Sequence, residues 1–293
     1  NHPARADASA TTLHEAADRP SGPFFEQNMP QAPVVHEQFA SDKVAINIDT
    51  DTPQSGEAAA SVVESNAPGS PSASPVGAPA VPVQVPAPMR LLYDVTGTAR
   101  GLHYQADAEL LFRHDAAQYD ARLELRSALG TRVQTSAGRI TPAGLAPTRF
   151  SSKWRSEQAA HFDPVQGRIT FSANTPDAPL LPGAQDRLSV LLQLGALLAA
   201  APARYPEGSA VEMQTAGPRD AEVWTFLREP HEALNLPGGT FATVKLSRAP
   251  RREYDQRVEA WLAPSLGYLP VRIRITQANG DFLDQQLRSS VAP

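Results

Sequence analysis

The sequence of 293 residues contains no cysteine. A disulfide, a thiolate metal site and a cysteine nucleophile are therefore excluded. It also has no run of about 18 apolar residues, the length that a membrane-spanning helix needs. Its 26 basic and 31 acidic residues are mixed rather than separated into a basic surface, so we expect no nucleic-acid partner. No phosphate-binding loop or metal-ligand spacing is present, and we expect no cofactor.

The first 88 residues differ in composition from the rest. They hold 13 of the 28 prolines but few aromatic residues, namely Phe24, Phe25 and Phe39. Ten acidic and three basic residues give this segment a net charge of −7. A segment of this kind cannot bury enough apolar surface to offset its chain entropy. We predict that residues 1–88 form a largely disordered, acidic Pro/Ala/Ser-rich spacer and that residues 89–293 form a folded domain.

The stretch from Gln256 to Ser289 shows the character of that domain. Apolar residues alternate with polar ones on both sides of a turn at 264–267, a pattern typical of an antiparallel hairpin with one buried face. The inward residues of this hairpin are predicted to be Val258, Ala260, Leu262, Val271, Ile273 and Ile275. Asn279–Gly280 then predicts a tight turn into a further strand, 282–287, because both residues tolerate positive φ. Similar alternation elsewhere predicts about eleven strands in all.

One helix is predicted within this series of strands, over residues 186–201. Asp186 has the side chain of a helix N-cap and Pro202 ends the segment. The residues between them are almost all leucine, valine or alanine, so the helix should be buried on most sides. We therefore predict a mainly β fold: a curved antiparallel sheet, as a half-open or closed barrel, wrapped on one apolar helix.

Three groups of residues resemble a known family. They are the opening Tyr93-Asp94-Val95, the segment 185–189 (QDRLS), and Trp261-Leu262-Ala263-Pro264 followed by 266–272 (LGYLPVR). Over about 90–289 the chain is similar to the bacterial domain-of-unknown-function family 3108. The resemblance implies a periplasmic envelope protein with a curved antiparallel sheet similar to lipoprotein-carrier half-barrels. It implies no catalytic residues.

The reactive residue types do not assemble into a catalytic pattern. His103 lies two strand positions from Asp107, but a solvated strand face explains both, and we expect no metal site. Ser265 lies in a turn and lacks the Gly-x-Ser-x-Gly context of a hydrolase nucleophile. The carboxylate pairs Asp107 with Glu109 and Asp281 with Asp284 alternate with arginines, as cross-strand ion pairs do. We expect no catalytic residue and no enzymatic activity.

The tryptophans are the strongest candidates for a binding site. Trp224 and Trp261 lie on the strand faces opposite their apolar neighbours, and such aromatic residues either line a groove or pack beneath the helix. We predict an apolar groove between helix and sheet with six candidate residues: Trp154, Trp224, Trp261, Leu191, Leu194 and Leu198.

These observations favour a non-enzymatic module that binds an apolar ligand (a lipid, an acyl chain or a lipidated peptide) or a partner protein of the envelope. One alternative is a structural scaffold that recruits an envelope protein through an open sheet edge. Another is a hydrolase whose site escapes sequence inspection. We expect the protein in the periplasm, tethered to the inner membrane by a segment upstream of Asn1.

Overall fold

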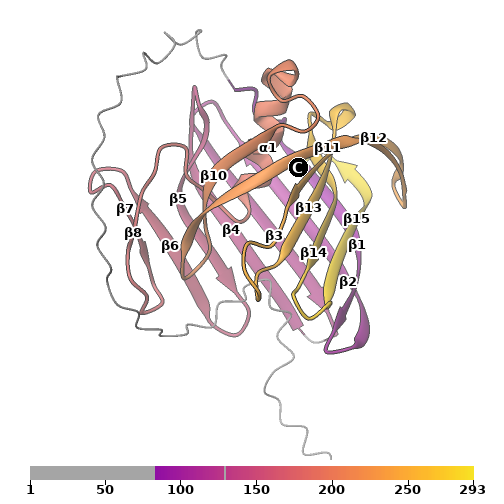
Figure 1. The fold of residues 1–293 in the computed structure, drawn as a ribbon, viewed down its shortest axis with the longest axis horizontal. Helices are drawn as coiled ribbons and strands as arrows, with labels where there is room; N and C mark the ends of the chain where they lie inside the picture. Colours follow the sequence, from indigo (N-terminus) through magenta and orange to yellow (C-terminus); the bar gives the residue numbers. More distant parts are fainter. Residues whose placement is uncertain (1–82, 129) are drawn as a thin grey trace, which may run out of the picture. The chain divides into compact units, whose positions relative to one another are not determined.

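The computed structural model describes residues 83–128 and 130–293 of the chain. Within them the fold is mainly β, as the alternation predicts, with a single α-helix (Figure 1). The strands are β1 (Met89–Ala99), β2 (Leu102–His114), β3 (Gln118–Ser127), β4 (Gly130–Thr141), β5 (Gly144–Lys153), β6 (Glu157–Asp163), β7 (Arg168–Phe171), β8 (Ala178–Pro179), β9 (Gln185–Asp186), β10 (Ala210–Ala216), β11 (Ala221–Leu236), β12 (Gly239–Arg248), β13 (Arg257–Ala263), β14 (Leu269–Thr276) and β15 (Phe282–Val291). The helices are α1 (Ser189–Ala200) and the 3-10 helices η1 (Pro202–Arg204) and η2 (Pro264–Leu266).

The fifteen strands form one sheet in the order β8-β7-β6-β5-β4-β3-β2-β1-β15-β14-β13-β12-β11-β10-β9. Neighbouring strands are antiparallel except for β9 and β10, which are parallel. The expected number of about eleven strands was too low, because two-residue strands such as β8 and β9 leave no alternation to detect. These two strands are the edges of the sheet and do not pair with each other, so the sheet is open rather than a closed barrel.

The predicted C-terminal hairpins are confirmed. Val258 lies opposite Ile275 and Ala260 lies opposite Ile273 in the β13–β14 pair. The turn between these strands contains η2 and ends at Gly267, which has φ of 64°. Gly280, with φ of 87°, lies in the next turn, and the strand after it pairs with both β14 and β1. Alternation alone was sufficient here because one face of these strands is buried.

The predicted helix is present, but its start and its cap differ from expectation. It begins at Ser189 rather than Asp186 and ends at Ala200 rather than Ala201. Asp186 is a residue of β9, so it is not the N-cap. Its carboxylate nevertheless accepts hydrogen bonds from the backbone N–H groups of Leu188 (2.9 Å) and Ser189 (2.8 Å). The parallel pairing of β9 with β10 holds Asp186 in an extended conformation, and the helix starts only after it.

The buried side chains form two clusters, and α1 contributes to both. Leu192 packs in the cluster beneath β1–β7, whereas Leu194 packs in the cluster of α1 with β10–β14. This explains why the helix is apolar nearly all round. Each buried leucine contributes roughly 1.5–3 kcal/mol to folding through removal of apolar surface from water.

The predicted spacer lies outside the described residues except for 83–88. Within this short segment, the backbone N–H of Val83 donates to the carbonyl of Pro142 and that of Gln84 to the carbonyl of Ala196 on α1. His114 Nε2 lies 2.8 Å from the carbonyl oxygen of Pro86. Residues 83–88 therefore lie against the domain.

Candidate ligand-binding site

A cavity lies between α1 and the inner face of the sheet. Its volume is about 50 Å³, several times the 10–15 Å³ or so that one water molecule occupies on the same measure. Most of its lining is apolar and comes from the first half of α1 and from seven strands. The lining residues are Leu110, Leu123, Gln134, Arg187, Leu188, Val190, Leu191, Leu192, Trp224, Gln256, Val258, Pro270, Ile273, Ile275 and Gln285.

The orientation of the side chains on β4 helps to explain why a cavity remains between α1 and the sheet. On this strand Arg132, Gln134 and Ser136 are buried, while Val133 is only half-buried. The apolar side chain therefore points away from the cavity and the polar ones point inward. Gln134 lies in the same cross-strand row as Leu123 of β3, which also lines the cavity.

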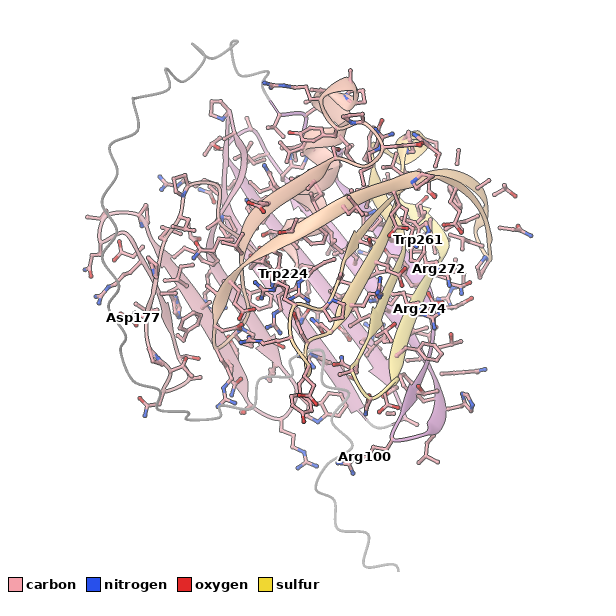
Figure 2. The ribbon with its side chains drawn as sticks, viewed as in Figure 1. Arg100, Asp177, Trp224, Trp261, Arg272 and Arg274 are labelled. Atoms are coloured by element: carbon pink, nitrogen blue, oxygen red, sulfur yellow. The ribbon has the colours of Figure 1, made fainter. Side chains whose placement is uncertain are left out.

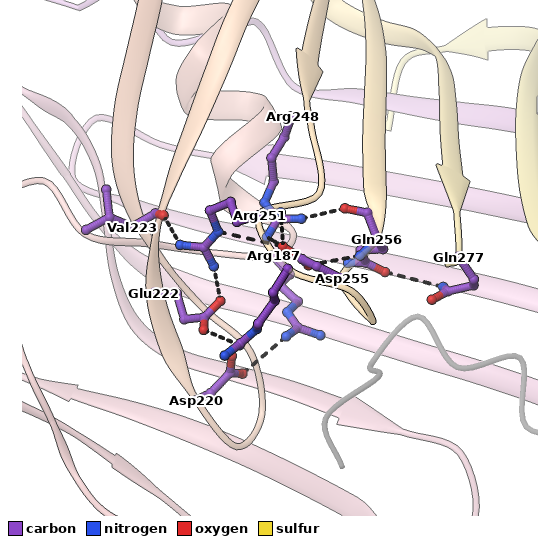
Figure 3. A network of polar contacts seen from close by, with 10 residues as sticks. Arg187, Asp220, Glu222, Val223, Arg248, Arg251, Asp255, Gln256 and Gln277 are labelled. Atoms are coloured by element: carbon purple, nitrogen blue, oxygen red, sulfur yellow. Dashed lines mark hydrogen bonds and ion pairs between the residues drawn. The ribbon is translucent and has the colours of Figure 1, made fainter. Parts of the chain in front are cut away.

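Two arginines lie on the Trp224 ring where it meets the cavity. The guanidinium carbon of Arg248 is 4.4 Å and that of Arg187 is 5.9 Å from the ring centroid. Figure 3 shows the bonds that hold these arginines: Arg248 donates to Asp255 Oδ2 (2.6 Å), and Arg187 donates to Asp220 Oδ1 (3.1 Å). Burial lowers the pKa of Arg248, and its bonds to the Asp255 carboxylate oppose that effect.

The same network extends outward through Glu222. Arg251 and Arg252 both form ion pairs with Glu222, and Arg251 also donates to the carbonyl oxygen of Val223 (2.7 Å). We call the four arginines 187, 248, 251 and 252 with Asp220, Glu222 and Asp255 the charged cluster. Each of its arginines has a carboxylate partner. Burial acts to raise the pKa of Asp255, but the hydrogen bond and charge of Arg248, together with the backbone N–H groups of Arg251 and Gln256, outweigh it and lower the pKa.

Four of the six predicted groove residues lie in one core cluster, namely Trp224, Leu191, Leu194 and Leu198. Of these, Trp224 and Leu191 line the cavity, whereas Leu194 and Leu198 pack around it. Trp154 is half-buried in the bend after β5, close to Gly130, and does not line the cavity. The structure thus brings together one tryptophan and the leucines, not all three tryptophans.

Trp261 does not line the cavity: it pairs with Arg272, whereas Val258 pairs with Ile275 at the cavity wall. Figure 2 shows Trp261 beside Arg272. Trp261 is only 4% exposed, because Arg272 and Lys245 lie 4.6 Å and 5.1 Å from its ring centroid. Its indole N–H donates to Glu232 Oε2 over 2.7 Å. Arg272 also binds Asp284 through two hydrogen bonds of 2.9 and 2.6 Å. Trp261 therefore packs among charged side chains and belongs to the core cluster that does not contain Trp224.

A second polar centre surrounds Asp186, which is fully buried. The Ser136 hydroxyl donates to its Oδ2 atom over 2.5 Å, and the hydroxyl groups of Tyr119 and Ser136 lie 2.9 Å apart. Burial raises the pKa of Asp186 to about 6, against the hydrogen bonds that favour its ionised form. None of these side chains lines the cavity. The centre joins β3, β4, β9 and the start of α1.

The other reactive residues singled out in the sequence have structural partners. Asp107 pairs with Arg288 (2.8 Å), Glu109 with Arg90 (3.8 Å), and Asp281 accepts the backbone N–H of Arg100 (2.8 Å). Ser265 lies in η2, and His103 is exposed on β2. Within 83–128 and 130–293, no three His, Asp or Glu side chains are grouped so that they could hold a metal ion.

Sequence reasoning missed the three glutamines that line the cavity, Gln134, Gln256 and Gln285. All three are buried. A glutamine at an inward strand position does carry a signal, because an unpaired amide is costly in a core. That signal can be used only once it is known which side chains of the strand point into the core.

The two sheet edges offer little backbone for an added strand. β8 and β9 each have two residues, and β8 ends in proline, which has no N–H to donate. None of the described helices has the length and hydrophobicity required to cross a membrane.

Comparisons with known proteins give two similar solved structures. One is a β-barrel-like protein of the domain of unknown function DUF1849 from Brucella abortus, with 11% identity, 71% of this chain and 98% of that chain covered, and a TM-score of 0.48. The other is a presumed exported protein with a YmcC-like fold from Bacteroides fragilis, with 12% identity, 72% and 99% covered, and a TM-score of 0.31. Likenesses this weak transfer no property to this chain. A search of curated proteins finds no match.

The family itself is decided by sequence. Residues 93–287 match the model of the protein of unknown function DUF3108, and this range contains β2 to β14 and most of β1 and β15. It also contains each of the residue groups on which the resemblance was based. The chain therefore belongs to the DUF3108 family.

Proposed function

We propose that the domain is a non-enzymatic binding module that takes up an apolar group in the cavity between α1 and the sheet. The observation that carries this proposal is the lining itself. Leucine, isoleucine and valine side chains from α1 and from the strands face one space, and Trp224 lies where this space meets the charged cluster. Pockets for small ligands are typically apolar, with a few polar groups that fix orientation.

The size of the cavity defines how binding would proceed. About 50 Å³ accommodates only a few heavy atoms, so a longer chain requires α1 to move away from the inner face. The first half of α1 provides Val190, Leu191 and Leu192 to the lining. The ligand would then replace contacts between helix and sheet with contacts of its own.

The test uses N-phenyl-1-naphthylamine, an uncharged apolar probe whose emission rises in apolar surroundings. We expect saturable binding to the delipidated full chain, with energy transfer from Trp224. Trp224→Phe should remove most of this transfer, whereas the matched variant Trp154→Phe should retain it.

A second pair of variants tests the place of binding. Leu191→Trp adds bulk at the cavity wall and should weaken probe binding about tenfold, whereas Leu102→Trp, at a residue 71% exposed on β2, should leave it unchanged. Equal binding by Leu191→Trp and the wild type would exclude this cavity as the site.

For the location, we infer the bacterial cell envelope outside the cytoplasm. The inference is supported by the acidic, proline-rich composition of residues 1–88, which suits a spacer that holds the domain away from an attachment point. Fractionation of bacterial cells that produce the protein tests it. Recovery in the cytoplasmic fraction alone would contradict it.

A further inference from the structure

We propose that the ligand of the cavity is an uncharged amphiphile: an apolar chain with a neutral hydrogen-bonding head, such as a glycerol ester, held by the side-chain amides of Gln134 and Gln285. This inference rests on the proposed function and specifies its ligand class.

The first observation is a pair of unsatisfied amides. Gln134 of β4 and Gln285 of β15 both line the cavity and are 5% and 3% exposed. Among the described residues, neither Gln134 Nε2 nor Gln285 Oε1 has a hydrogen-bond partner. One of these atoms is a donor and the other is an acceptor. The cavity therefore offers both kinds of hydrogen bond to an occupant.

The second observation is the chemistry of their neighbours. Gln134 lies opposite Leu123 in its cross-strand pair, and Gln285 lies opposite Ile273. Leucine or isoleucine at both positions would complete an apolar wall. A buried amide atom without a partner costs about 1–3 kcal/mol, so these glutamines disfavour the empty domain. A ligand with an acceptor and a donor removes that cost.

The third observation concerns charge. The arginines beside the cavity are already paired: Arg187 with Asp220, and Arg248 with Asp255. Within the part of the chain that the structure describes, no lysine lines the cavity. A carboxylate or phosphate head would have to compete with these aspartates, whereas a neutral head need only meet the two amides. This favours an ester, amide or alcohol over an anionic lipid.

The arrangement also limits the head group. β1, β2 and β3 lie between β4 and β15 in the sheet, so the two amides approach the cavity from different directions. The head therefore needs at least two hydrogen-bonding groups. A glycerol monoester supplies an ester carbonyl as acceptor and hydroxyls as donors.

The experiment compares 1-monodecanoylglycerol with decanoate at pH 8, by calorimetry on the delipidated full chain. The two share one chain length and differ in the charge of the head. We expect the ester to bind at least about tenfold more tightly, the ratio that one retained hydrogen bond gives. Equal binding, or tighter binding of decanoate, would overturn the proposal.

Gln134→Leu and Gln285→Leu test the amides directly. Each should weaken binding of the monoester about tenfold, whereas the affinity for N-phenyl-1-naphthylamine should hold or rise, because the cavity wall becomes more apolar. Each should also keep or raise the melting temperature, because an unpaired buried amide is removed. The control is Gln166→Leu in the exposed turn between β6 and β7, which should change nothing.

The outcomes separate the two proposals. Unchanged monoester binding by both leucine variants would show that ordered water alone satisfies the amides, which overturns the ligand class but not the site. Failure of the wild type to bind N-phenyl-1-naphthylamine would overturn the proposed function itself.

Discussion

The Ser136 hydroxyl on β4 donates a 2.5 Å hydrogen bond to the carboxylate of Asp186 on β9. These two strands lie far apart in the sheet order, yet this bond brings an edge of the sheet onto its inner face. Gln185 strengthens the junction by donating to the carbonyl of Leu145 on β5 (2.7 Å). Side-chain hydrogen bonds thus hold β9 against β4 and β5, with which it forms no backbone ladder.

The pKa of Asp186 predicts a pH dependence of stability. Because the folded-state pKa is about 6 and the ordinary value is 3.8, the folded protein binds a proton that the unfolded chain releases between these values. The free energy of unfolding should therefore fall as pH rises from about 4 to 7, by roughly 3 kcal/mol from this group. Asp186→Asn should flatten that part of the profile, as measured by urea unfolding at several pH values. Identical slopes in wild type and variant would contradict the assignment.

Removing the side chain altogether has a different result. Asp186→Ala leaves the backbone N–H groups of Leu188 and Ser189 and the Ser136 hydroxyl without their acceptor. An amide at 186 keeps an acceptor for the backbone, and Ser136 can accept from its NH₂. We expect the alanine variant to be less stable than the asparagine variant by at least about 2 kcal/mol at every pH.

Gln193 should anchor the middle of α1. Its Oε1 accepts the N–H of Leu145 (2.8 Å) and its Nε2 donates to the carbonyl of Ala143 (2.8 Å). Gln193→Leu makes the helix more apolar yet leaves the buried N–H of Leu145 without an acceptor. We expect a loss of about 2 kcal/mol in urea unfolding, against no change for Gln166→Leu. A stabilised variant would show that hydrophobicity alone positions the helix.

At Gly195 we expect alanine to destabilise the fold, the opposite of its usual effect in a helix. Glycine to alanine in a helix interior ordinarily stabilises by about 1 kcal/mol. Here an added Cβ would lie 2.6 Å from the carbonyl oxygen of Tyr268, which belongs to backbone and cannot rotate away. Gly195→Ala should therefore lower the melting temperature. A rise would mean that α1 shifts readily from the sheet.

Arg272 provides a test of the packing around Trp261. It binds Asp284, which is 4% exposed, through two hydrogen bonds and packs on Trp261. Arg272→Ala should cost about 3 kcal/mol because it removes the main partner of a buried carboxylate. Arg272→Lys keeps the charge but not the paired geometry and should recover only part of that loss. Trp261 emission should shift to longer wavelength in both variants, and an unchanged spectrum would argue against this packing.

The sequence by itself determined the strands and the helix wherever one face is buried. Val258, Ala260 and Leu262 alternate because the inner face of β13 excludes water, and the segment after Asp186 is apolar on all sides because α1 packs in both clusters. These are local consequences of burial, and periodicity reports them directly. The family resemblance rested on the same stretches, and the range that matches the family model, 93–287, includes them.

Only the tertiary structure decided the site. Gln134 and Val133 are neighbours on β4, and hydrophobicity alone would turn Val133 inward; pairing with β3 and β5 turns Gln134 inward instead. Trp224 reaches the cavity while Trp261, on a strand of the same sheet, is buried by arginine and lysine side chains instead. The direction in which a side chain points depends on the neighbouring strands, which can be distant in sequence. The residues of a strand do not by themselves specify which strands those neighbours are.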